Sequence, residues 1–237
     1  MKKFRWLRLV LIALALISAA GFILWANNTP QVMPTALESL ESDTAVQVDT
    51  NPWISFTPQS MSPSTGLILY PGGRVSPESY APAARKIAEA GYLVVMPRMP
   101  LNLAVFGIEK ANEIIAEYPY IETWAIGGHS LGGAMAAQYA GKYPEQIQGL
   151  VLWASYPAEN NDLSEQELAV VSIFGSRDGL ADPQDVLGAQ PILPATTQWV
   201  EIDGGNHAGF GWYGEQRGDL QATISRKEQQ NQIVRVT

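Results

Sequence analysis

Short apolar runs alternate with amphipathic segments along most of the chain after residue 44. Apolar runs bounded by glycine, proline or polar residues predict strands, and apolar residues at helical spacing predict helices. We expect strands at residues 45–48, 53–56, 67–70, 92–96, 124–126, 150–153, 170–174 and 199–202. We expect helices at residues 80–90, 108–117, 133–140, 182–187 and 225–234. This alternation predicts an α/β fold with a mostly parallel central sheet and helices on both faces.

The N-terminal segment has a different pattern. Residues 9–26 are uncharged and mostly apolar, and they follow four basic residues, Lys2, Lys3, Arg5 and Arg8. The run is just long enough to span a bilayer as a helix. Its positive flank predicts that Met1 stays in the cytoplasm and that the rest of the chain lies outside, in a single-pass protein of the cell membrane.

A cleaved signal peptide is the competing interpretation, because Ser18, Ala19 and Ala20 form a small-residue cleavage site. The apolar run continues past that site to Trp25, so we favour an uncleaved signal anchor; cleavage would make the protein secreted instead. We divide the chain into this anchor (1–26), a stalk with proline and polar residues (27–43) and one α/β domain (44–237).

Composition narrows the classes of partner. The chain carries 15 basic and 23 acidic residues, and four of the basic ones precede residue 27, which leaves 11 against 23 in the exported part. That formal charge of −12 argues against nucleic acid or an anionic membrane surface as the ligand of the domain. The chain has no cysteine, which excludes disulfides and a thiol nucleophile. The oligomeric state stays open.

The pentapeptide at residues 128–132, Gly-His-Ser-Leu-Gly, stands between an apolar strand and a small-residue helix. Strand, Gly-x-Ser-x-Gly and helix together form the pattern of a nucleophile elbow, in which Ser130 occupies a strained turn. The flanking positions are glycine because side chains there would collide with the strand or helix beside them. We expect His129 to be structural, because the second elbow position points away from the pocket of the nucleophile.

An activated serine needs a base and an orienting acid. Outside the elbow the only histidine is His207, in a glycine-rich loop after the strand at 199–202. Asp178 falls just past the end of the strand at 170–174, where α/β sheets present functional groups. The order serine, aspartate, histidine is the order found in α/β-hydrolases. Three other carboxylates compete for the role of the acid: Asp182, Asp185 and Asp203.

On these motifs, residues 66–226 resemble the α/β-hydrolase superfamily, and they are most similar to its compact, lidless members of the dienelactone-hydrolase-like group. The resemblance implies Ser130 as nucleophile, His207 as base and Asp178 as orienting acid. It also implies an oxyanion hole built from the backbone N–H of Leu131 and one from the loop at 70–74. Gly73 is the best-matched second donor, with the Arg74 N–H as the alternative. No metal or organic cofactor is required.

The substrate pocket is expected to be open. Only residues 154–169 separate two predicted strands where larger relatives insert a cap; the segment has room for one small helix at 164–168 but not for a lid domain. The apolar run 99–106 either lines the site or is a buried loop. Candidate pocket residues are Arg74, Phe106, Phe210 and Trp212. Arg74 either recognises a substrate carboxylate or is a solvated surface arginine.

We therefore expect a membrane-anchored, extracytoplasmic serine hydrolase that cleaves a small-molecule ester or related acyl compound. Two alternatives remain. An acyltransferase would use the same three residues with an alcohol, sugar or amine as the acceptor, and a non-catalytic surface binding protein would use only the fold.

Overall fold

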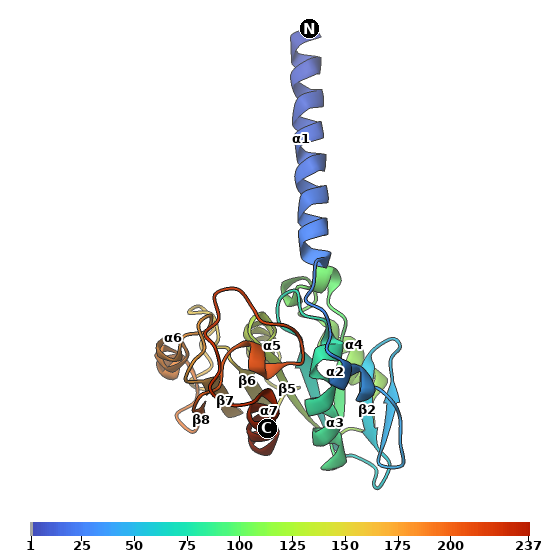
Figure 1. The fold of residues 1–237 in the computed structure, drawn as a ribbon, viewed down its shortest axis with the longest axis vertical. Coiled ribbons are helices and arrows are strands. Elements are labelled where there is room, and N and C mark those ends of the chain that lie inside the picture. Colours follow the sequence, from blue (N-terminus) through green and yellow to red (C-terminus); the bar gives the residue numbers. More distant parts are fainter. Residues whose placement is uncertain (1) are drawn as a thin grey trace.

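The computed structural model describes residues 2–237 and contains one mixed sheet of eight strands (Figure 1). The strands are β1 (Val46–Asp49), β2 (Ile54–Pro58), β3 (Thr65–Tyr70), β4 (Leu93–Met96), β5 (Thr123–His129), β6 (Gly149–Trp153), β7 (Ala169–Gly175) and β8 (Gln198–Ile202). Their order in the sheet is β1-β2-β4-β3-β5-β6-β7-β8. β2 pairs antiparallel with both of its neighbours, β1 and β4. The remaining neighbours, from β4 to β8 in the sheet order, pair parallel.

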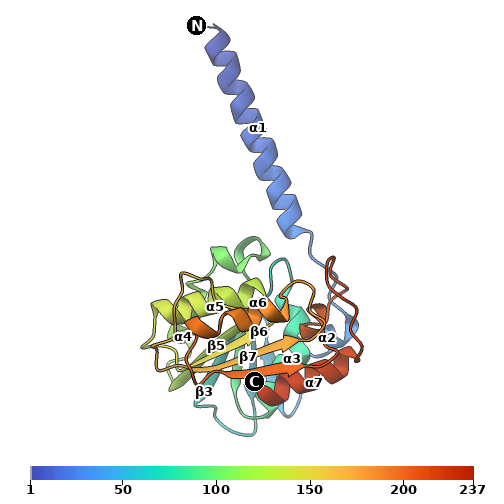
Figure 2. The same cartoon turned by 90° about the vertical axis from the view of Figure 1, so that its left-hand side faces the viewer.

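The helices form a layer on each face of this sheet (Figure 2). The helices of the described chain are α1 (Lys2–Asn27), which stands outside these layers, and α2 (Pro34–Glu38), α3 (Ala81–Glu89), α4 (Lys110–Glu117), α5 (Leu131–Lys142), α6 (Pro183–Gly188) and α7 (Arg226–Val236). Buried side chains of α3 and α7 belong to one apolar core, and those of α4 and α5 belong to the other. The predicted α/β fold with a mostly parallel sheet is confirmed.

The central strands are apolar throughout because helices cover both of their faces. All four residues of β4 are buried, and so are the last five of β3. The segment between β6 and β7 contains turns and no helix. Residues 164–165, where the sequence left room for one small helix, form a turn. The expectation of a domain without a sizeable cap is confirmed.

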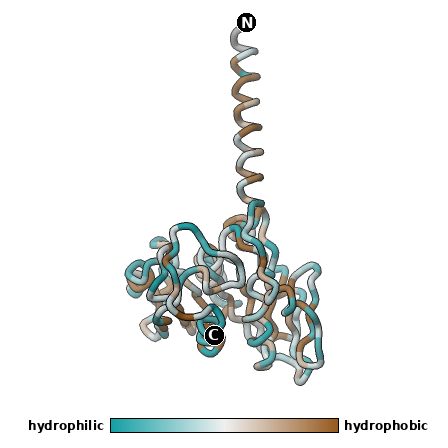
Figure 3. The backbone as a smooth tube through the Cα atoms, in the orientation of Figure 1, coloured by the Kyte–Doolittle hydropathy of each residue, from teal (hydrophilic) through white to brown (hydrophobic). Residues whose placement is uncertain are grey.

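Helix α1 projects from the domain as a single straight rod (Figures 1 and 3). Residues Trp6–Asn27 form an apolar segment of 22 residues; its most apolar window of 18 residues has a mean hydropathy of 2.6, and 6% of that window is buried. The segment is long enough to cross a bilayer at 1.5 Å per residue. Met1, which the charge pattern assigns to the cytoplasm, lies outside the described residues.

Residues 27–43 differ from the expected stalk, because they lie along the domain. Val32 forms a β-bridge with Tyr213, and the Met33 N–H donates to the Trp212 carbonyl at 2.9 Å. Ala36 of α2 is fully buried. Proline and polar residues are typical of a flexible linker, but backbone pairing to residues far along the chain fixes this one, and no local pattern reports such pairing.

Candidate active site

The residues that bear chemistry gather at the carboxyl ends of the parallel strands. Ser130 lies between β5 and α5 with φ 54° and ψ −125°, which is a left-handed conformation that only a constrained turn imposes on a serine. Its N–H donates to the Trp153 carbonyl at 2.9 Å. A Cβ on Gly128 would lie 2.5 Å from the Gly132 carbonyl carbon, and a Cβ on Gly132 would overlap the backbone of Tyr70. The turn therefore excludes side chains at both flanking positions.

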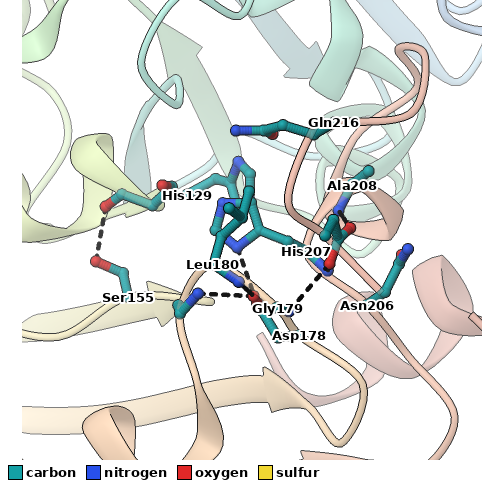
Figure 4. Close-up of polar contacts among 12 residues, drawn as sticks. His129, Ser155, Asp178, Gly179, Leu180, Asn206, His207, Ala208 and Gln216 are labelled. Carbon is teal, nitrogen blue, oxygen red and sulfur yellow. Dashed lines mark hydrogen bonds and ion pairs between the residues drawn. The ribbon is translucent and has the colours of Figure 1, made fainter. Parts of the chain in front are cut away.

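Asp178 and His207 face one another across the ends of β7 and β8. The His207 Nδ1 lies 2.8 Å from Asp178 Oδ2, and both side chains are almost completely buried (Figure 4). The other carboxylate oxygen, Oδ1, accepts the N–H groups of Leu180 at 2.9 Å and Ala181 at 2.7 Å. Because a carboxylate only accepts, the Nδ1 atom carries the proton.

The other carboxylates have different partners. Asp182 caps α6 by accepting the Gln184 N–H at 2.8 Å, and Asp203 accepts the Ser176 hydroxyl at 3.2 Å. Asp178 alone among the four candidate acids hydrogen-bonds to His207 within the described residues.

The second imidazole nitrogen of His207 is the important exception to this pairing. Nε2 is buried and has no hydrogen-bond partner within residues 2–237, and the Ser130 hydroxyl forms no hydrogen bond to it there. The structure thus contains the hydrogen bond between Asp178 and His207 but not one between the Ser130 hydroxyl and His207. A buried nitrogen without a partner is rare in proteins and needs a functional or structural reason.

Asp219, which no sequence motif identifies, holds the two loops of this pair together. Its Oδ1 accepts the N–H of Gly179, which lies in the loop after β7, at 3.2 Å. The same oxygen accepts the N–H of His207 at 3.2 Å. Its Oδ2 accepts the Ala208 N–H at 2.8 Å. One carboxylate therefore fixes the backbone on both sides of the contact between Asp178 and His207.

Helix α7 fixes the histidine loop from the other side. The amide of Gln229 pairs with the Asn206 backbone, accepting the N–H at 3.1 Å and donating to the carbonyl at 2.7 Å. Gln230 donates to the Gly209 carbonyl at 2.7 Å, and Arg226 donates to the carbonyls of Ala208 and Gly211. The polar helix predicted at the C-terminus thus supplies buried amides to the site.

The backbone N–H groups of Gly73 and Leu131 lie beside the turn and have no hydrogen-bond acceptor within the described residues. A Cβ on Gly73 would lie 3.3 Å from the Leu131 side chain, so the two residues are neighbours. The adjacent amides are occupied: the Gly72 N–H donates to the Tyr80 hydroxyl at 3.0 Å, and the Arg74 N–H donates to the Asn102 carbonyl at 2.7 Å. The geometry favours Gly73 over Arg74 as an available donor.

His129, the second residue of the elbow, packs its ring against that of His207. Its ring centroid lies 4.5 Å from that of His207 (Figure 4). The ring of Phe210 stacks on His129 with a centroid distance of 5.6 Å. Burial, together with the nearby His207, lowers the pKa of His129 well below its ordinary value. Burial raises the pKa of Tyr80, whose hydroxyl lies 2.9 Å from His129 Nδ1. The protonated phenol therefore donates to a neutral imidazole.

The four predicted pocket residues separate into two groups. Arg74 and Phe106 both contact the end of α1. The Arg74 guanidinium lies 4.5 Å from the centre of the Trp25 ring and donates to the Asn28 carbonyl. Phe106 packs edge to face on Phe22, and 53% of it is exposed. Phe210 is fully buried, so its assignment to an open pocket wall is wrong. Trp212 lines a cavity between α2, α3 and α7.

Comparisons with known proteins agree with this geometry. A family model described as "Alpha/beta hydrolase family" matches residues 66–231. One similar solved structure is MGS-MChE2, an alpha/beta hydrolase enzyme from a sediment metagenome of the lagoon of Mar Chica, Morocco: 18% identity over 69% of this chain and 90% of that chain, TM-score 0.56. Another is described as a "predicted CIB-like hydrolase" from Thermoplasma acidophilum: 19% identity over 81% of this chain and 97% of that chain, TM-score 0.57. At these identities both show the fold alone. No curated protein matches the chain.

The role of Asp219 can be tested by its stability effect. We expect Asp219→Asn to lower the free energy of unfolding by about 1–3 kcal/mol, because the new amide group faces backbone N–H donors that lose a charged acceptor. Thermal unfolding of the full chain in detergent measures this. Asp203→Asn is the matched control and should change stability by less than about 0.5 kcal/mol. Equal effects of the two substitutions would contradict the role.

The neutral state of His129 predicts a pH dependence of stability. Below about pH 6.5 the unfolded chain binds a proton at His129 while the folded protein does not, so stability falls as the pH falls. His129→Gln should reduce this slope by up to about 1.4 kcal/mol per pH unit. Denaturant unfolding of both proteins between pH 5 and 7.5 measures the difference. The same slope in both would show that His129 is not held neutral.

Proposed function

The chain belongs to the α/β-hydrolase family, and from that premise we propose that it is a serine hydrolase acting on an ester or a related acyl compound. In this proposal Ser130 is the nucleophile, His207 is the general base and Asp178 orients the imidazole. The observation that carries the proposal is the state of His207, whose Nδ1 is held by a buried carboxylate while its Nε2 has no partner among the described residues.

That state supports a defined proton path. With Nδ1–H donated to Asp178, the lone pair of Nε2 is free to take the hydroxyl proton of Ser130. Ser130 precedes α5 directly, and its strained turn presents the hydroxyl at the sheet edge. Catalytic hydrogen bonds are often long or absent without substrate and tighten in the complex. The missing hydrogen bond between Ser130 and His207 is therefore compatible with the proposal.

The reaction then follows in two balanced steps. The Ser130 oxygen attacks the acyl carbonyl carbon as its proton passes to His207 Nε2. The bond from that carbon to the alcohol oxygen breaks, and the proton leaves with the alcohol. Water next attacks the acyl-enzyme, gives one proton to Nε2, and releases the acid as the proton returns to Ser130. Asp178 stabilises the imidazolium in each step.

The negative charge of each tetrahedral intermediate needs donors. The N–H groups of Gly73 and Leu131 lie next to one another and have no acceptor within the described residues, which supports them as the oxyanion hole. Leu131 also begins α5, whose N-terminal end favours negative charge. Loss of one such donor typically costs about 2.7–4 kcal/mol of transition-state stabilisation.

We further propose that α1 remains attached as a single-pass anchor and that the domain lies outside the cytoplasm. The basic residues before the apolar run support this orientation. The contacts of α1 support retention: Ala26 is fully buried, and the Asn102 amide donates to its carbonyl at 3.3 Å.

The first test is covalent labelling of the full chain in detergent with a fluorophosphonate probe. We expect wild type to be labelled and Ser130→Ala to be unlabelled, because the probe reacts only with an activated serine. Hydrolysis of p-nitrophenyl esters should disappear with the same substitution. Failure to label a folded sample would refute the proposal and favour a non-catalytic binding protein.

The acid is assigned by a pair of substitutions. Asp178→Asn should lower kcat for p-nitrophenyl ester hydrolysis by about three to four orders of magnitude, because an amide favours the wrong tautomer of His207. Asp182→Asn is the matched control: asparagine caps a helix as well as aspartate, so its kcat should match wild type. A loss of kcat confined to Asp182→Asn would reverse the assignment.

A further inference from the structure

The end of α1 is attached to the loops that border the proposed oxyanion hole. Trp25 lies under the Arg74 guanidinium at 4.5 Å, and Arg74 also donates to the Asn28 carbonyl. Asn102 donates from its side chain to the Ala26 carbonyl, and the ring of Phe22 meets that of Phe106 edge to face at 6.4 Å. The membrane segment therefore contacts the loop at 100–106 at several points.

The same loop forms one side of the site. Arg74 follows Gly73 directly, and its N–H donates to the Asn102 carbonyl at 2.7 Å. The Leu103 side chain lies 3.8 Å from the position that a Gly73 Cβ would occupy. Figure 1 shows α1 leaving the domain beside the green ribbon of this loop. The edge of the domain that carries the proposed site is thus the edge that faces the end of the anchor.

This edge also exposes apolar side chains. Val105 is 47% exposed and Phe106 is 53% exposed, and Phe106 lies against Phe22 of α1. Phe22 precedes Trp25 by three residues, which is about 4.5 Å along a helix. A tryptophan at the end of a spanning helix sits at the membrane interface. Phe106, in contact with Phe22, would then reach about one helical turn beyond the interface, into the apolar region.

Charge decides which lipid surface fits this edge. The domain has a formal charge of −12, which repels anionic headgroups. Arg74, the cation nearest to Gly73 in the chain, is committed to Trp25 and Asn28. Burial of Val105 and Phe106 in a neutral or zwitterionic leaflet needs no positive patch.

From this geometry we propose that the site at Ser130 takes its substrate from the bilayer, as an acyl ester of a neutral or zwitterionic membrane lipid. The proposal rests on the proposed serine hydrolase activity and adds a substrate class to it. Val105 and Phe106 enter the leaflet on the side of the domain, and the lipid ester reaches Ser130 without crossing water.

The insertion is tested with cysteine probes, because the natural chain has no cysteine. The full-length variants Phe106→Cys and Tyr120→Cys are each labelled on the new cysteine with an environment-sensitive fluorophore. Each labelled protein is then reconstituted into phosphatidylcholine vesicles. Tyr120 is the matched control, with the same 53% exposure at the opposite, amino end of β5. We expect a blue shift and quenching by doxyl-labelled lipid at position 106 and neither at position 120. Equal signals at both positions would overturn the proposal.

The substrate class is tested with two esters on the same vesicles. One is a fluorogenic phosphatidylcholine in the bilayer, and the other is soluble p-nitrophenyl butyrate. We expect cleavage of both, and we expect Phe106→Ser to lower the ratio of lipid to soluble rate by about tenfold, while Tyr120→Ser leaves it unchanged.

The two proposals fail in different ways. Labelling of Ser130 and cleavage of the soluble ester without cleavage of the lipid ester would overturn the lipid substrate and leave the hydrolase intact. Absence of fluorophosphonate labelling would overturn the hydrolase, and the lipid substrate with it, whatever the fluorophore reports.

Discussion

The buried carboxylate of Asp178 constrains the loops that form the candidate site. A charge removed from water is costly unless hydrogen bonds replace its hydration. Here the N–H groups of Leu180 and Ala181 serve one oxygen and His207 serves the other. Each of these partners must be held in place, so the loops after β7 and β8 cannot move independently. Asp219 ties them to each other, and the amides of α7 tie the histidine loop to the domain.

Backbone strain gathers around the same edge of the sheet. Non-glycine residues with positive φ include Ser130, Ala154, Arg74, Leu101 and Asn102. Each such residue costs on the order of 1–3 kcal/mol and persists only where its surroundings determine it. Backbone hydrogen bonds hold these residues in place. The N–H groups of Ser130 and Ala154 donate to carbonyls of neighbouring strands, and the N–H of Arg74 donates to the Asn102 carbonyl. The strain thus follows the proposed nucleophile and the loop that meets α1.

Sequence patterns predicted most of the fold and pointed to three candidate site residues, because strands and the ends of strands leave local signatures. Apolar runs marked the strands, and Ser130, Asp178 and His207 each follow such a run. Asp219 left no signature, because its importance comes from three amides on two distant loops. Phe210 was misplaced because the short 3-10 turn at Ala208–Phe210 directs its ring inward onto His129. The backbone of Trp212 pairs with Ser79 and Met33, and no local pattern reports pairing with residues so far along the chain.

Arg74 connects the candidate site to the end of α1. A free arginine beside an oxyanion hole would favour an anionic substrate through a bidentate contact with its carboxylate. The guanidinium instead covers Trp25 and binds the backbone at the end of α1. A guanidinium used in this way attaches the loop that contains Gly73 to the end of α1. An uncharged acyl group, bordered by Leu103 and approached past Phe106, is the ligand that this arrangement suits.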